Sequence, residues 1–426
     1  MKNIIIIGFL LFSTTCYEVL AQADTSNFTL VNEERFDAIA ATQQYIDKLS
    51  PEQKAKSDAY YEGGYWTILW EFVIEILTAW IFLSLGLSKW IKRVASKAKK
   101  INIRNLIYIL MYLFLVFLIA FPYNVYTYFF REHSYGLSNM TFSQWLSESL
   151  AQAALFIVFG SLLIMSLYVV MRKITGHWWI WGSGIVFVFL IFLIFIAPVF
   201  ISPLFNKYTP LEEGTIRDEI LSLARANSVP VTNVYQFNAS KQTSNISANV
   251  SGIGSTIRIS LNDNLLNKCT PAEIKSVMAH ELGHYVLNHT YKRLISFSIF
   301  IIIGFALINF LMKKAIGRFG EKWGIESISD IGSLPLFAVL FSFFIFISTP
   351  ITNNISRSAE SEADIFGLNA AGEPDGMASV AMKLSDYRKI DPSRFEEIIF
   401  YSHPSGKGRV FMAMKWKAEH LNIKAE

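Results

Sequence analysis

The segment His280-Glu281-Leu282-Gly283-His284 contains the residue types most directly suited to chemistry. On a helix, His280 and His284 lie on one face about one turn apart, so both imidazoles can reach one metal ion. Glu281 points about 100° away from His280, so its carboxylate can contact a water at the metal rather than the metal itself. This is the zincin arrangement, in which the glutamate is the general base.

The residues around this segment predict that it is helical. Thr270 can cap a helix, Pro271 suits the first helical position, and Glu273 can complete a capping box. Apolar residues then recur at helical spacing, at Ile274, Val277, Met278 and Leu282. This context disfavours the alternative, which is a chance match to the motif.

A metal held by two histidines needs a third protein ligand. The segment 354–372 reads as a helix that ends at Gly372, with Pro374 beyond it. Glu360 and Asp364 share one face of this helix, whereas Glu362 faces elsewhere and is expected to be solvated or paired with another group. The spacing suits one carboxylate on the metal and one that orients an imidazole, but it also fits a solvated acidic face.

The composition is that of a membrane protein. Of 426 residues, 52% are hydrophobic and 17% are charged, whereas soluble domains have about 25% charged residues. The net charge is 38 − 34 = +4, and the basic residues cluster beside apolar runs, which favours positive-inside bias over nucleic-acid binding. Of the two cysteines, Cys16 lies in the first apolar run, which disfavours a disulfide with Cys269 and excludes a cysteine-based metal site.

The apolar runs divide the chain. Residues 1–23 read as a signal peptide or a signal-anchor span, and 24–65 as a polar extramembrane segment. Residues 66–201 should form a four-span bundle and 294–350 two more spans, giving about seven spans if the first is retained. Because two spans separate them, 202–293 and 351–426 face the same side and can form the two halves of one catalytic domain. The six runs lie at about 66–88, 105–122, 149–171, 178–201, 294–312 and 333–350.

Taken together, these motifs resemble the CAAX prenyl protease family of integral-membrane zinc endopeptidases. The resemblance rests on His280 to His284 followed, after two spans, by Ser356-Arg357, Glu360 and Ala363-Asp364. It extends over about residues 30–426. Further matching segments are 203–211, 240–244 (similar to that family's strand before the helix) and Ser402-His403-Pro404-Ser405 followed by Arg409.

The resemblance implies a mainly α-helical membrane bundle that encloses a chamber, with a zincin-like α+β catalytic domain and one Zn²⁺ per chain. It implies Glu360 as third ligand, Asp364 in contact with a ligand, and Arg357 near the site. It also implies that His403 stabilises the transition state, although a histidine before proline is otherwise often only a turn residue.

One segment departs from the family. Ser247-Ala248-Asn249 stands where the family usually has Asn-Ala-Tyr, whose asparagine is thought to help hold the substrate or oxyanion, so Ser247 and Asn249 are candidate substrate contacts in its place. Arg258 is a third candidate, because 256–260 alternates like a strand that either pairs with substrate or lies inside a small sheet.

Three other polar residues are not assigned to the metal site. Glu71 and Glu75 lie inside an apolar run and could line a chamber, unless Glu71 lies at the membrane interface. His289 is nine residues after His280 and is expected to face away from the metal, as an interface or solvent residue.

The leading function is therefore a membrane-embedded zinc metalloendopeptidase that acts on peptides or membrane-associated proteins in the lipid bilayer, with no nucleic acid partner. The alternatives are a quality-control protease without prenyl specificity, a transporter or channel with structural zinc, and a catalytically silent scaffold. The signal-like start and charge bias indicate the bacterial cytoplasmic membrane. Counting positive charges places the catalytic domain on the outer side of the membrane. The resemblance to eukaryotic family members implies the opposite orientation, so both sides are kept as alternatives.

Overall fold

Six long helices dominate the computed structural model, which describes residues 36–252 and 257–421. Each is long and apolar enough to cross a membrane, and together they account for the six apolar runs. The further span predicted within residues 1–23 lies outside the described residues. The six comprise α3 (Pro51–Leu83), α5 (Ile101–Val125) with its extension to Ser134, α7 (Phe142–Lys173), α8 (Trp178–Ile196) with its extension to Phe205, α13 (His289–Trp323) and α14 (Leu334–Ala371).

Local sequence explains where several of these helices begin and change pitch. Capping boxes start α3 at Ser50 and α7 at Thr141. The π-helical segments η1 (Tyr126–Arg131) and η2 (Ala197–Ile201) come after Pro122 and at Pro198. Proline has no N–H and clashes with the preceding turn, so the backbone widens there rather than continuing as a regular α-helix.

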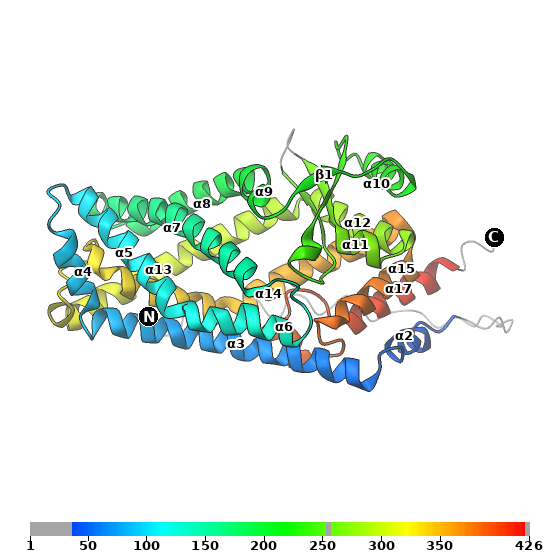
Figure 1. Cartoon of the computed structure of the whole chain (residues 1–426), viewed down its shortest axis with the longest axis horizontal. Helices are drawn as coiled ribbons and strands as arrows, with labels where there is room; N and C mark the ends of the chain where they lie inside the picture. The colour runs from blue at the N-terminus through cyan, green and yellow to red at the C-terminus, as the bar shows by residue number, and fades with distance from the viewer. Residues whose placement is uncertain (1–35, 253–256, 422–426) are drawn as a thin grey trace, which may run out of the picture. The chain divides into compact units, whose positions relative to one another are not determined.

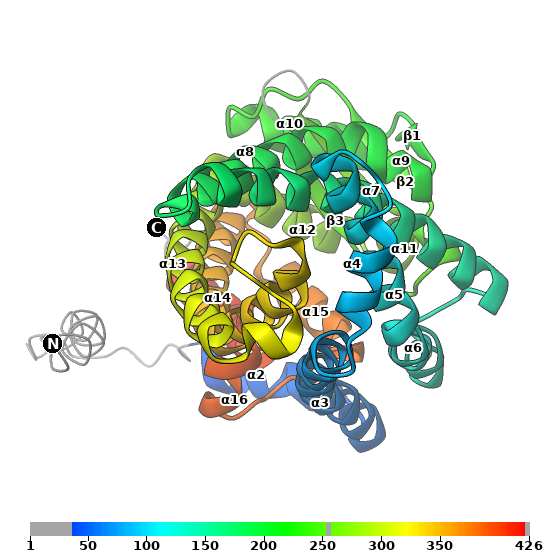
Figure 2. The same cartoon turned by 90° about the vertical axis from the view of Figure 1, so that its left-hand side faces the viewer.

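The six helices form a closed ring. α3 contacts α5, and contacts continue through α7, α8, α13 and α14 back to α3, as the end-on view shows (Figure 2). The ring has a core of fully buried aromatic residues, including Trp178, Tyr108 and Tyr168. The two tyrosine hydroxyls are satisfied by serines, since Tyr108 pairs with Ser88 at 2.6 Å and Tyr168 with Ser333 at 2.9 Å.

The basic loop after α3, which includes α4 (Leu87–Ala95), meets the loop between α13 and α14. Lys92 Nζ donates to Asp330 Oδ2 at 2.6 Å and to the Gly324 carbonyl at 2.9 Å. Four spans, an even number, separate the two loops in sequence, so both loops should lie on the same side of the membrane, as this contact requires.

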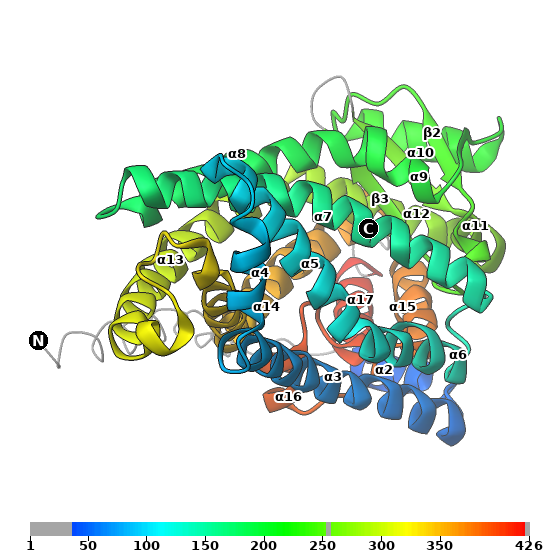
Figure 3. The same ribbon diagram turned by 60° about the vertical axis from the view of Figure 1, so that its left-hand side comes forward.

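Two predicted boundaries fall inside single helices. α3 begins at Pro51, so residues 51–65 of the predicted polar segment continue the first span as one helix. α14 crosses the boundary at 350/351 and ends at Ala371, with Gly372 in the left-handed region at φ 64°. The last span and the helix with Glu360 are therefore one continuous helix, which leads from the ring toward α15 (Pro374–Lys383) and α17 (Gly406–Leu421) (Figure 3).

The two intramembrane carboxylates differ in their surroundings. Glu75 lines a cavity of about 560 Å³ between α3, α5 and α7, together with Trp145, Glu148 and Gln152. Glu71 is exposed and lies within 3.3 Å of the Tyr128 hydroxyl. Of the two interpretations, lining an internal space therefore fits Glu75.

A four-stranded mixed sheet lies beside α10 (Thr215–Ala226), α11 (Asp263–Lys268) and α12 (Pro271–Val286) (Figure 1). The strand order is β1-β2-β4-β3, with β2 and β4 parallel and the other pairs antiparallel. Ile259, Leu261, Met278 and Leu282 join the sheet and α12 in one apolar core. The strands are β1 (Tyr208–Pro210), β2 (Val234–Phe237), β3 (Ala248–Ser251) and β4 (Arg258–Asn262).

The sheet tests two predicted strand segments, 240–244 and 256–260. The segment 240–244, expected to be a strand, contains the end of a 3-10 turn, η3 (Ala239–Lys241), and a loop, so that expectation was wrong. β4 lies inside the sheet, and β3 is one of the two edge strands of the described part, with β1 at the other edge. The predicted fold class, a membrane helix bundle with a zincin-like α+β domain, is confirmed.

Candidate metal centre

α12 and α14 bring the predicted ligands together because two glycines allow their backbones to touch. A Cβ on Gly283 would lie 3.3 Å from the Ala363 backbone, and one on Gly367 would lie 3.0 Å from the His280 nitrogen. α12 itself begins at the predicted capping box, in which the Thr270 N–H donates to Glu273 Oε2 at 2.7 Å. This close approach of the two helices places Glu360 opposite the two histidines.

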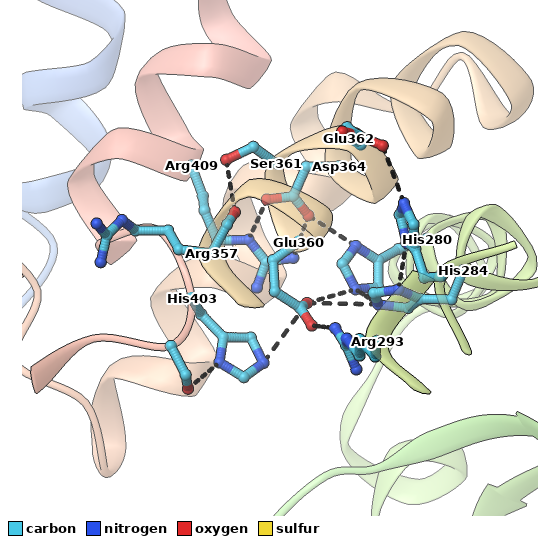
Figure 4. Close-up of polar contacts among 12 residues, drawn as sticks. His280, His284, Arg293, Arg357, Glu360, Ser361, Glu362, Asp364, His403 and Arg409 are labelled. Carbon is cyan, nitrogen blue, oxygen red and sulfur yellow. Dashed lines mark hydrogen bonds and ion pairs between the residues drawn. The ribbon is translucent and has the colours of Figure 1, made fainter. Parts of the chain in front are cut away.

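Three donor atoms converge at this crossing (Figure 4). His280 Nε2 and His284 Nε2 are 3.1 Å apart, and Glu360 Oε2 lies 3.2 Å from the first and 3.4 Å from the second. Metal bonds of about 2.0–2.2 Å at tetrahedral angles separate neighbouring ligand atoms by roughly 3.3–3.5 Å. The three side chains therefore fit a single small divalent ion with little rearrangement, and they form a metal-type cluster within the described residues.

His280 is oriented by a buried ion pair. Its Nδ1 lies 2.7 Å from Asp364 Oδ1, and Arg409 donates to both carboxylate oxygens of Asp364, at 2.9 and 2.5 Å. Because the carboxylate accepts only, Nδ1 holds the proton and Nε2 presents its lone pair to the metal position. Burial lowers the pKa of His280, but Asp364 and Glu360 outweigh it and raise the pKa to about 9, so a metal ion that binds at Nε2 would displace a proton from that nitrogen.

His284 is oriented by His289, so the expectation that His289 faces away from the metal was wrong. His289 is 1% exposed, and its Nδ1 lies 2.8 Å from Nδ1 of His284. His289 Nε2 lies 3.1 Å from Glu362 Oε2, so Nε2–H donates to that carboxylate and Nδ1 accepts from His284 Nδ1–H. His284 Nε2 is thereby left free to bind the metal.

The expectation failed because it continued one helix through His289. α12 ends at Val286, and Asn288 adopts the left-handed region at φ 59° before α13 begins at His289. Because the chain turns at Asn288, the His289 side chain lies against His284. An unbroken helix would have placed it on the opposite face. The sequence signal that could have found it is the Leu-Asn pair after Val286, because asparagine tolerates a left-handed helix end.

Replacing His289 with alanine is expected to weaken metal binding about 10- to 100-fold, because His284 loses the acceptor that fixes its tautomer. The measurement is chelator competition for metal on the purified chain. His177→Ala, at an exposed histidine in the loop before α8, is the matched control and should bind metal like the parent. An unchanged affinity in His289→Ala would show that His289 only fills space.

Arg357 lies elsewhere than expected. Its guanidinium donates to the carbonyls of Glu397 and Tyr401 at 2.5 and 2.7 Å and to Asn354 Oδ1 at 2.8 Å. Arg357 therefore holds the backbone that leads to His403 and does not contact Glu360 or Asp364. The arginines that contact those carboxylates are Arg409 and Arg293, and Arg293 Nη2 donates to Glu360 Oε1 at 2.7 Å.

Glu281 and His403 line one cavity of about 320 Å³ with the three donor residues. Burial raises the pKa of the Glu281 carboxyl. His403 Nε2 lies 3.5 Å from Glu360 Oε2, and burial lowers the pKa of this imidazole to about 3, which keeps it neutral. Its Nδ1 is 3.0 Å from the Ser402 hydroxyl, so with Ser402 donating, Nε2 carries the proton toward the cavity.

The predicted substrate contacts separate in the structure. Ser247 lines the cavity with Ile246 and Ala248, at the start of edge strand β3. Asn249 follows on β3 but is not among the residues that line this cavity. Arg258 was wrongly expected there, because on internal strand β4 its side chain points to the Pro198 carbonyl, at 2.7 Å, and stacks over Tyr208.

Comparison with known proteins decides the family. A model described as Peptidase family M48 matches residues 210–417, and one described as CAAX prenyl protease N-terminal, five membrane helices, matches residues 37–207. The chain belongs to peptidase family M48. It is an integral-membrane metalloprotease related to the CAAX prenyl proteases, so the predicted family and enzyme class are confirmed.

Relatives of this M48 chain come from bacteria and eukaryotes. One is the Uncharacterized metalloprotease YhfN of Bacillus subtilis, 31% identical over 283 residues, or 66% of each chain. CAAX prenyl protease 1 of Saccharomyces cerevisiae is 28% identical over 68% of this chain and 67% of its own length. The crystal structure of S. mikatae Ste24p shares the fold, with a TM-score of 0.73 at 23% identity, covering 88% of this chain and 94% of that one.

Proposed function

We propose that this chain is a zinc-dependent endopeptidase that hydrolyses peptide bonds of peptides or membrane-associated proteins. The observation that carries the proposal is the convergence of His280, His284 and Glu360 in a cavity that also contains Glu281. A structural zinc site would use four protein ligands, whereas three ligands beside a carboxylic acid suit catalysis. This donor set therefore favours a peptidase over a transporter with structural zinc or a silent scaffold.

Two imidazoles and a carboxylate suit zinc, one ion per chain, and Asp364 and His289 would hold the two imidazoles in the tautomers that bind it. When bound, zinc supplies Lewis-acid polarisation of the substrate carbonyl and lowers the pKa of water. All further chemistry is assigned to side chains of the chain.

Glu281 is proposed as the general base and acid. Its carboxylate takes a proton from the attacking water as the new C–O bond forms, and then gives that proton to the amine as the C–N bond breaks. The raised pKa of the half-buried Glu281 carboxyl favours its protonated form as the carrier of this proton. His403 is proposed to donate its Nε2–H to the oxyanion that develops on the carbonyl oxygen.

Edge strand β3 is proposed to bind the extended substrate backbone. Within the described residues β3 pairs only with β4, so its other edge can accept a peptide strand, and Ser247 at its start lines the cavity. Asn249 remains a candidate contact for the part of the substrate beyond the cavity. The ring of spans supports membrane-associated substrates, and the B. subtilis relative supports a bacterial cytoplasmic membrane as the location.

Chelation is expected to lower peptidase activity at least ~10²-fold, and stoichiometric zinc should restore it, because carbonyl polarisation is lost with the metal. The test uses the full chain in detergent, with zinc content measured by mass spectrometry and cleavage of casein and quenched peptides measured in parallel. Cleavage that persists in metal-free protein would contradict the proposal. So would a chain that holds one zinc and cleaves none of these substrates.

A further inference from the structure

Arg388 brings a positive charge without a partner into the site cavity. It lies between η6 (Leu384–Asp386) and α16 (Arg394–Phe400) and lines the cavity with Glu360 and His403. The two other arginines that line this cavity are paired with carboxylates, Arg293 with Glu360 and Arg409 with Asp364. Within residues 36–252 and 257–421, Arg388 has no hydrogen bond or ion pair, and its contact is with the Tyr387 ring, 5.8 Å away.

An unpaired guanidinium in this position is costly. Arg388 is partly buried, and burial lowers the pKa of its guanidinium from the ordinary value. Arginine nevertheless stays charged in proteins, and its planar fork matches a carboxylate through two parallel hydrogen bonds. The cavity therefore contains a donor group that a carboxylate would satisfy.

A second cavity continues the same charge. It has a volume of about 460 Å³ and shares Ile246 and Tyr387 with the site cavity, so the two spaces adjoin. The charged residues that line it are Lys56, Lys268, Lys383 and Asp386, and Lys383 is ion-paired with the buried Glu273. The two other lysines face a single acid, so the lining keeps a small excess of positive charge. A substrate segment that extends from the metal centre past Arg388 thus enters a basic environment, which favours a negative group there.

We propose that Arg388 binds a carboxylate of the peptide substrate. This inference rests on the proposed peptidase function and adds a substrate class to it. Two sources supply the same chemistry, the α-carboxylate at a substrate's C-terminus and the side chain of an aspartate or glutamate. Arg388 acts in this proposal as a binding residue that selects and positions the substrate.

Binding can be measured without turnover in the zinc-loaded Glu281→Gln chain. Fluorescent nine-residue peptides are prepared in matched pairs, with a C-terminal acid or amide, and with internal Asp or Glu against Asn or Gln. We expect the acid member of one kind of pair to bind about 10- to 100-fold more tightly by fluorescence anisotropy. A preference in the terminal pair identifies the α-carboxylate, and a preference in the internal pair identifies an acidic side chain.

Adding Arg388→Met should reduce this preference to within about 3-fold, with the neutral peptides bound as before, because only the charged hydrogen bonds are lost. Arg388→Lys should retain part of the preference. Lys415→Met, at a side chain that is 64% exposed on α17, is the matched control and should retain all of it.

Two results would overturn the proposal: equal binding of both members of every pair by the parent, or an undiminished preference in Arg388→Met. The proposed peptidase function is tested separately. It would fail if the zinc-loaded chain with Glu281 intact did not cleave quenched peptides. The binding measurement does not depend on that result.

Discussion

Glu281→Gln is expected to lower kcat about 10²- to 10⁴-fold, since glutamine cannot take the proton of the attacking water or return it to the leaving amine. Metal content should stay at the level of the parent, because the three donor atoms belong to His280, His284 and Glu360. Glutamine keeps the size of the side chain in the cavity, so the loss should appear in kcat.

The measurement is steady-state cleavage of a quenched peptide together with zinc analysis of the same preparation. Glu419→Gln, an exposed acid on α17, serves as the control and should retain full activity. Full activity in Glu281→Gln would remove Glu281 from the chemistry. Loss of zinc with the activity would instead assign it a structural role at the metal.

Arg409→Met is expected to destabilise the folded chain by about 3–5 kcal/mol, because it leaves a buried carboxylate without its cation. Asp364 is 0% exposed and Arg409 is 9% exposed, so water cannot replace the lost hydrogen bonds. The measurement is denaturant unfolding of the full chain in detergent, monitored by tryptophan fluorescence.

The double variant Asp364→Asn with Arg409→Met separates stability from metal binding. Removing both charges should recover part of the lost unfolding free energy, as for other buried pairs replaced together. Zinc affinity should stay below that of the parent, because His280 Nδ1 then lacks an anionic acceptor. A single Arg409→Met variant as stable as the parent would contradict the assigned pairing.

Features that depend on neighbouring residues were predictable. The capping box at Thr270 and the helical spacing through Leu282 are local, so they placed His280, Glu281 and His284 correctly on one helix. The apolar runs predicted six spans for the same reason, although helices α3 and α14 continue beyond their apolar parts. The parity of two spans put both polar halves on one side, which the crossing of α12 and α14 requires.

Pairings between distant segments were decided by packing. The sequence offered two arginines for the site, Arg357 before Glu360 and Arg409 after His403-Pro404. Only the position of α17 relative to α14 makes Arg409 the partner of Asp364. The order of the strands similarly turned Arg258 away from the cavity and left β3 at the edge.

The sequence by itself predicted the donor types of the candidate metal centre and a candidate general base, and it determined the membrane spans and the family. The tertiary structure decided which groups contact the predicted donor residues and which cavity-lining arginine has no ion pair among the described residues. The reason is that capping and periodicity act within one or two turns of a helix. The contact of His289 with His284 depends instead on a left-handed residue at Asn288, and the place of Glu360 and Asp364 opposite the histidines depends on the close crossing at Gly283 and Gly367.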